Sequence, residues 1–102
     1  MPAKPPPLSP AELAEIIEQV FTLGIPIIPT KKFGLRGRER NFTTSDAIEV
    51  FRTGTVTRDP IWNEAHEDWN YDVLGFDAEG QPLTIRIAVA PNRSGVILIT
   101  GF

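Results

Sequence analysis

The chain has 102 residues, the length of one small domain, and 41% of them are apolar while 23% are charged. This composition is typical of a folded globular protein, and it excludes a fibrous chain or one that is disordered throughout. Cysteine is absent and histidine occurs once, so disulfides, thiolate chemistry and zinc sites with sulfur ligands are excluded. The net charge of −3 argues against broad nucleic-acid binding, which normally needs a basic surface, but it is compatible with a local basic patch.

Signals for a membrane or for secretion are missing from the sequence. No apolar run approaches the roughly 18 to 20 residues that cross a bilayer, and MPAKPPP lacks the apolar stretch of a signal peptide. We therefore expect a cytoplasmic protein without membrane contact.

The first part of the chain is predicted to hold a leader and a helix. Residues 1–8 form a Pro-rich leader that we expect to be disordered, and residues 9–102 are predicted to form a single domain. Ser9 is placed to cap the helix and Glu12 to complete a capping box, with proline between them in the first helical position. Apolar residues then recur at helical spacing, namely Leu13, Ile16, Ile17, Val20 and Phe21.

Two short helices are predicted in the middle of the chain. The run IPIIPT, residues 25–30, precedes them and contains two prolines, so it is predicted to be an edge strand or an extended connector. KKFGLRGRER, residues 31–40, is a weak helix because its two glycines each cost about 1 kcal/mol relative to alanine. SDAIEVFRT is the second helix, and Thr43 and Asp46 have the spacing of a capping box at its start.

Beyond Gly54 the sequence changes to β-branched and aromatic residues, which predicts strands. TVTR, residues 55–58, is predicted to open a strand. WNYDVLGF and PLTIRIAVA form a hairpin around DAEGQ, and VILITGF follows as an apolar strand near the centre of the sheet. The predicted fold class is α+β, with an N-terminal amphipathic helix and one or two short helices packed on a three- to four-stranded antiparallel sheet.

The basic residues gather in one segment. Five of the ten Lys and Arg residues fall within residues 31–40, and Lys32, Arg36 and Arg40 form one ridge if this segment is helical. Like charges on a ridge repel, so the ridge needs solvent, acidic neighbours or an anionic ligand. Two interpretations stay open at this point: a solvated face paired with the acidic segment 59–72, and a binding site for an anion such as an RNA phosphate.

Arg86 stands among apolar residues in the middle of a predicted strand. Either it points to water from an open sheet face, or it reaches into a groove where it clamps a phosphate. Tyr71 and Thr100 also lie on predicted strands and are candidates to neighbour it, although alternation alone does not set the register of the strands.

The single histidine, His66, lies in the acidic stretch NEAHEDW. We interpret it as a surface-loop residue in preference to a catalytic base, because no substrate proton is identified within its reach. Trp62 and Trp69 flank the loop and are expected to anchor it to the core. No motif for a metal, a phosphate loop or a catalytic triad is present, so we predict no metal site and no cofactor.

A longer pattern runs from Lys32 to Thr100. It consists of two arginines, an aromatic–Thr pair, an Asp, a Gly, a hairpin motif and a closing Thr, at Arg36, Arg40, Phe42, Thr43, Asp46, Gly54, Tyr71, Val73, Gly75, Asp77, Gly80, Leu83 and Thr100. The pattern resembles a family of small uncharacterised bacterial domains whose members read His-Ala-x-x-Arg-x-x-x-Arg-Gly-Ile-[Ser/Thr]-x-x-Asp before the hairpin. Lys32 stands where that family has its His, and Asn41 stands where it has a Gly.

This family is similar in layout to RelE-like ribonuclease toxins, so the resemblance implies their fold and a bacterial toxin-type domain that binds RNA. Whether the domain also cleaves RNA stays open. In this interpretation Arg36, Arg40, Arg86 and Thr100 bind the substrate, and Lys32 or Tyr71 assists proton transfer. The alternative is a non-enzymatic protein-interaction module, whose basic ridge or edge strand meets an acidic, antitoxin-like protein segment. A homodimer without a ligand is a third alternative.

Overall fold

The computed structural model describes residues 5–56 and 59–102 and confirms the α+β class. Its helices are α1 (Pro10–Thr22), α2 (Lys31–Arg40) and α3 (Thr44–Thr53). Its strands are β1 (Ile27–Pro29), β2 (Thr55–Val56), β3 (Ile61–Asn63), β4 (Asp68–Phe76), β5 (Pro82–Val89) and β6 (Val96–Gly101), with a 3-10 turn (Pro91–Arg93) before β6. The first half of the predicted leader and the second half of TVTR lie outside the described residues.

The sheet is larger than the sequence predicted. It has six strands within the described part of the chain, in the order β1-β6-β5-β4-β2, and β3 pairs with the start of β4. Its neighbours run antiparallel except β1, which lies parallel to β6 and makes the sheet mixed. The expected count of three to four antiparallel strands was too low. β1 is the edge strand that the sequence allowed as an alternative to a connector, and β3 has only three residues, too few to show an alternating pattern.

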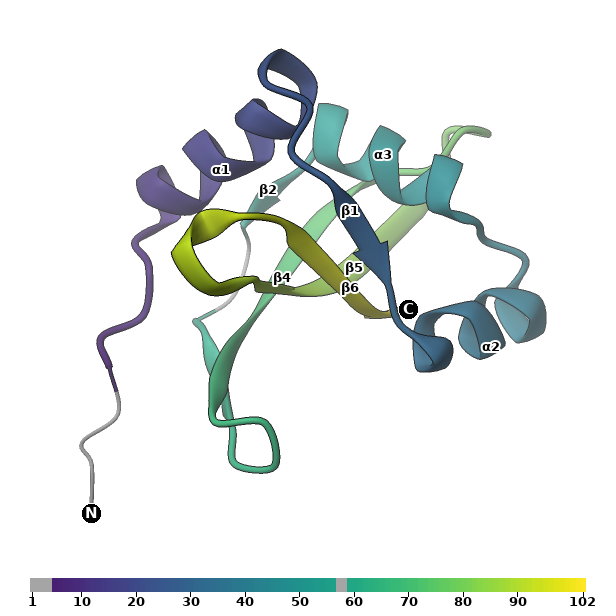
Figure 1. Cartoon of the computed structure of the whole chain (residues 1–102). Helices are drawn as coiled ribbons and strands as arrows, with labels where there is room; N and C mark the ends of the chain where they lie inside the picture. Colours follow the sequence, from purple (N-terminus) through teal and green to yellow (C-terminus); the bar gives the residue numbers. More distant parts are fainter. Residues whose placement is uncertain (1–4, 57–58) are drawn as a thin grey trace.

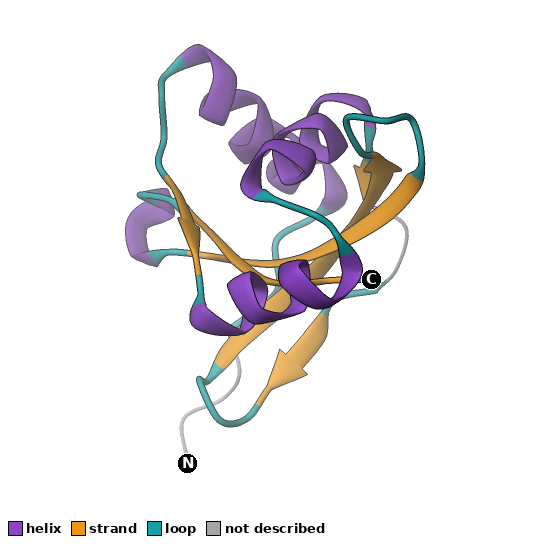
Figure 2. Cartoon of the chain, turned by 90° about the vertical axis from the view of Figure 1, so that its right-hand side faces the viewer, coloured by secondary structure: helices purple, strands orange, loops and turns teal. Residues whose placement is uncertain are grey.

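The core lies between the sheet and two of the helices. α1 and α3 lie on the same side of the sheet, while the hairpin of β3 and β4 projects at the opposite end of the molecule (Figure 1, Figure 2). The core-facing residues of β5 are Leu83, Ile85 and Ile87, and the buried residues of α1 that belong to the same cluster are Leu13, Ile16 and Ile17. The residues of β4 and β5 between the core positions face the other way, and we call that side the open face.

The described end of the leader runs beside β4. The indole N–H of Trp69 donates to the carbonyl oxygen of Pro5 at 2.7 Å. The backbone N–H of Leu8 donates to the hydroxyl oxygen of Tyr71 at 3.0 Å. These contacts lie on the core side of the sheet, because Tyr71 belongs to the core cluster.

α2 forms in spite of its two glycines because it is held at its start and along one side. The hydroxyl of Thr30 accepts from the N–H of Phe33 at 3.2 Å and donates to the carbonyl of Leu98 in β6 at 2.8 Å. A Cβ on Gly37 would lie 2.5 Å from the carbonyl oxygen of Phe42, so this glycine permits close packing. The helix ends at Asn41, whose left-handed backbone (φ 59°, ψ 46°) is one that asparagine tolerates well.

A bulge in β6 decides which side chains share the open face. Leu98 pairs with Ile87 and Thr100 pairs with Arg86, so Ile99 is an extra residue between the two pairs. In a regular strand Leu98 and Thr100, two residues apart, face the same way. The bulge turns Thr100 out of the core and places it beside Arg86.

Candidate functional site

Four of the six predicted site residues line one cleft beside α2. Lys32 and Arg36 come from the helix, Arg86 from β5 and Thr100 from β6, and Phe102 adds its side chain at the end of the chain. The cleft has a volume of about 320 Å³. We call it the cationic cleft, because three of its side chains are Lys or Arg.

Arg86 is held in the cleft by a carboxylate. Its Nε and Nη2 donate to the two carboxylate oxygens of Asp72 at 2.8 and 3.1 Å, and Asp72 is 1% exposed. The hydrogen bonds to Asp72 raise the pKa of Arg86, so the guanidinium stays charged. The guanidinium also lies 5.3 Å from the centroid of the Phe102 ring. A bidentate pair uses two of the five N–H groups of an arginine, so three remain for a ligand.

The ridge of α2 is divided between two places. Lys32 and Arg36 enter the cationic cleft, whereas Arg40, one turn further on, lines a depression beside Asp77 and Glu79 of the β4–β5 turn. Arg36 pairs with Glu39 of its own helix at 3.4 Å. Among the described residues the ridge makes no ion pair with the acidic segment 59–72, which instead supplies the partner of Arg86.

Tyr71 is not brought to the cleft. Its side chain faces the core, is 4% exposed and pairs across the sheet with Ile87, on the opposite face from Arg86. Burial raises the pKa of the Tyr71 phenol, which therefore stays protonated at neutral pH. The structure thus places the two predicted proton-transfer residues, Lys32 and Tyr71, on different sides of the sheet.

A second cavity adjoins the cleft, and sequence reasoning missed it. It has a volume of about 420 Å³ and lies between α2 and the turn of the β3–β4 hairpin; its polar residues include Lys32, Asn63, His66 and Asp68. We call it the hairpin pocket. The repeated Trp-Asn at 62–63 and 69–70 is a sequence signal that could have indicated the β3–β4 hairpin. Trp62 and Trp69 are directly opposed in this hairpin, with their ring centroids 5.2 Å apart.

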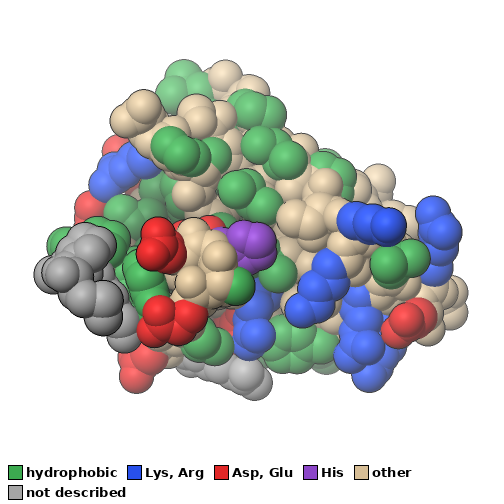
Figure 3. Space-filling model, turned by 60° about the horizontal axis from the view of Figure 1, so that its bottom comes forward, with side chains coloured by type: hydrophobic (Ala, Val, Ile, Leu, Met, Phe, Trp, Pro, Cys, Tyr) green, Lys and Arg blue, Asp and Glu red, His purple; other side chains and the backbone are tan. Residues whose placement is uncertain are grey.

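The open face carries exposed apolar side chains next to the charges. Leu74 and Phe76 follow Asp72 at alternate positions of β4 and are 40% and 50% exposed, and Phe102 is 40% exposed. Figure 3 shows the molecule from below: most Lys and Arg side chains lie toward the right, most acidic side chains lie toward the left, and the histidine lies between them. The surface therefore combines a basic region with aromatic groups despite the acidic net charge.

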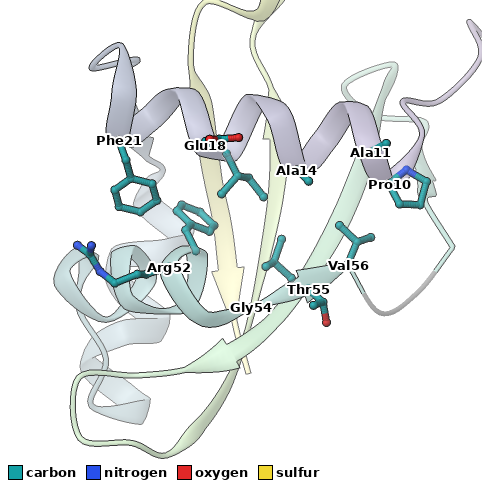
Figure 4. Close-up of a pocket in the computed structure, with 12 residues that line it drawn as sticks. Pro10, Ala11, Ala14, Glu18, Phe21, Arg52, Gly54, Thr55 and Val56 are labelled. Carbon is teal, nitrogen blue, oxygen red and sulfur yellow. The ribbon is translucent and has the colours of Figure 1, made fainter.

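A third depression is unsuited to an anion. It lies between α1, α3 and β2 and is lined mainly by apolar groups such as Ala14 and Val56 (Figure 4). The charged side chains that line it are Glu18 and Arg52, and the guanidinium of Arg52 lies 5.0 Å from the centroid of the Phe21 ring. It offers no concentration of positive charge.

Comparisons with protein families, curated proteins and solved structures find no match to this chain. Within residues 5–56 and 59–102, no three His, Asp or Glu side chains are grouped so as to hold a metal ion. None of the described helices has the length and apolar character needed to cross a membrane.

Proposed function

We propose that this protein binds single-stranded RNA, with the cationic cleft holding the phosphate backbone. The observation that carries the proposal is the convergence of Lys32, Arg36, Arg86 and Thr100, which are spread over 69 positions of the chain, on one cleft. A phosphate accepts hydrogen bonds from guanidinium, ammonium and hydroxyl groups, and all three are present there.

The arrangement of Arg86 favours a role in orienting the phosphate. Its charge is balanced by Asp72, so the positive charge available to an anion comes mainly from Lys32 and Arg36. The exposed ion pair of Arg36 with Glu39 competes only weakly with a phosphate for the guanidinium, since such pairs contribute only about 0 to 1 kcal/mol to stability. Arg86 offers fixed donors whose direction is set by the bidentate pair.

The exposed rings beside the cleft support a single strand as the ligand. Unpaired bases stack on aromatic side chains. Phe102 is exposed and lines the cleft, and Phe76 is exposed on the same face of the sheet, at the end of β4. As part of the same proposal, the protein is a bacterial domain with the layout of RelE-like toxins and is located in the cytoplasm. We propose RNA binding and not RNA cleavage. Cleavage is tested separately, by running the samples of the binding assay described below on a denaturing gel.

The test compares residues of the same helix inside and outside the cleft. Binding of a short fluorescein-labelled oligouridine is measured by anisotropy over a range of salt concentrations. Lys32→Ala and Arg36→Ala are expected to weaken binding and each to reduce the slope of log affinity against log salt by about 0.7, the value for one phosphate contact on a single strand. Lys31→Ala and Arg38→Ala are the matched controls. Each removes one positive charge from a different side of α2 and is expected to leave the slope unchanged.

Two results would overturn the proposal. One is equal weakening by all four variants, which would indicate a general charge effect without a site. The other is the absence of RNA binding by the folded protein at low salt, which would favour the alternative of a protein-interaction module that uses the basic ridge or an edge strand.

A further inference from the structure

The hairpin pocket has the make-up of a site for a small, flat ligand. Its floor is apolar and consists of Ala88 from β5 with Ile97 and Ile99 from β6, while its rim carries the polar side chains. Ligand sites in proteins commonly combine an apolar lining with a few polar groups and have volumes of about 300 to 1,000 Å³. The volume of about 420 Å³ falls within this range.

Two side-chain oxygens on one face of β4 have no hydrogen-bond donor among the described residues. Asp68 Oδ1 is buried and accepts no hydrogen bond from them, and neither does Asn70 Oδ1, which lies two residues further on and outside the lining of the pocket. Asn70 is 6% exposed. Buried acceptors without a partner are uncommon in folded proteins, because each forfeits its hydrogen bond to water. Because Asp68 lines the hairpin pocket, a ligand that brings N–H groups there would supply the missing donors once the carboxylate turns toward it.

Asp68 is partly set back from water and lies close to His66. Burial raises the pKa of Asp68, and the nearby His66 opposes this shift. His66 lies on the hairpin turn and also lines the pocket, where its imidazole offers a flat face of the kind on which bases stack. Lys32 closes the opposite side of the pocket.

Lys32 connects the pocket to the cationic cleft, because its side chain lines both. A nucleotide whose phosphate lies at Lys32 therefore has its base within reach of the pocket. We propose that the hairpin pocket binds the base of a nucleotide held at the cationic cleft, and that Asp68 selects guanine. This inference rests on the proposed function, since it names the preferred substrate of the same surface.

Guanine is the RNA base that fits a carboxylate best. Its Watson–Crick edge presents two adjacent N–H donors, and an ionised carboxylate accepts with both oxygens at once. Adenine and cytosine present one amino donor beside a ring nitrogen that is an acceptor, and uracil presents one N–H between two carbonyl oxygens. Each of these places an acceptor against the carboxylate of Asp68.

The first test measures base preference in the same anisotropy assay. Short oligouridines with a single central G, A, C or U are compared, and the one with G is expected to bind about tenfold more tightly than the one with U, within the range of a good bidentate contact. Asp68→Asn is expected to bring this ratio close to one. Glu67→Gln is the matched control: it removes the same charge from the neighbouring exposed residue and is expected to keep the ratio.

The second test needs no variant. His66 is the only histidine of the chain, so its imidazole gives a single set of proton resonances in NMR spectra. Guanosine 5′-monophosphate is expected to shift these resonances in a saturable way, and uridine 5′-monophosphate at the same concentration is expected to leave them nearly in place.

The outcomes separate the two proposals. Weakened RNA binding in Lys32→Ala together with no preference for G, or equal NMR responses to the two nucleotides, would overturn guanine selection and leave RNA binding at the cleft intact. A preference for G that persists in Asp68→Asn would remove Asp68 as its cause. No binding of any oligonucleotide or nucleotide by the folded protein would overturn both.

Discussion

The ion pair of Arg86 and Asp72 is predicted to be a main determinant of stability, and Arg86→Met tests this. The substitution removes the guanidinium but leaves a carboxylate that is 1% exposed and has lost its bidentate partner. Removing one member of a buried ion pair typically costs about 3 to 5 kcal/mol. Asp72 has a further interaction besides the one with Arg86, and the Arg86 side chain is 26% exposed, so water already screens the pair. We therefore expect a loss near the lower end of this range, about 3 kcal/mol.

The reverse change is expected to cost less. In Asp72→Asn the group that loses its charged partner is the Arg86 guanidinium, which reaches solvent. The expected loss of stability is therefore about 1 to 2 kcal/mol. The double variant Asp72→Asn with Arg86→Met contains neither charge, and we expect it to be more stable than Arg86→Met alone. The two changes are therefore not additive, with a coupling energy above about 1 kcal/mol.

The measurements are urea unfolding and thermal unfolding at neutral pH, both monitored by far-UV circular dichroism. A loss of 3 kcal/mol corresponds to a fall in Tm of about 10 to 20 °C for a domain of this size. A cost of less than about 1 kcal/mol for Arg86→Met with an unchanged m value, or additivity of the two single changes, would refute the role assigned to the pair. Because Arg86→Met is expected to weaken the fold, Lys32 and Arg36 are the cleaner probes of RNA binding.

Three further predictions concern two glycines and Tyr71. Gly34→Ala is expected to stabilise the protein by about 0.5 to 1 kcal/mol, because no atom lies within 4 Å of the added Cβ and alanine favours the helix. Gly101→Ala is expected to destabilise the protein by about 1 to 3 kcal/mol, because the Cβ would lie 2.8 Å from the Phe42 ring. Thermal unfolding of the two glycine variants measures whether each change raises or lowers Tm, and a change of Tm in the same direction in both variants would contradict the packing described here. Tyr71→Phe is expected to cost about 1 kcal/mol through the lost bond to the Leu8 N–H and to leave RNA affinity unchanged. A tenfold loss of affinity in a folded Tyr71→Phe protein would contradict the separation of Tyr71 from the cleft.

The sequence by itself determined the features that depend on near neighbours in the chain. Both predicted capping boxes form: Ser9 and Glu12 bond reciprocally at α1, and Thr43 and Asp46 do so at α3. The weak helix at residues 31–40 also forms, with Lys32 and Arg36 on one ridge. Contacts of this kind join residues three or four positions apart, so the pattern of residue types specifies them directly.

Only the tertiary structure decided what stands opposite the ridge. The bulge at Ile99 places Thr100 beside Arg86, and the register of β4 with β5 places Asp72 opposite Arg86 and sends Tyr71 to the core. A shift of one residue in either register would exchange the faces, and no local signal in the sequence fixes it. The pairing of β3 with β4, which forms the hairpin, likewise depends on packing, because β3 has only three residues and is too short to be recognised from the sequence.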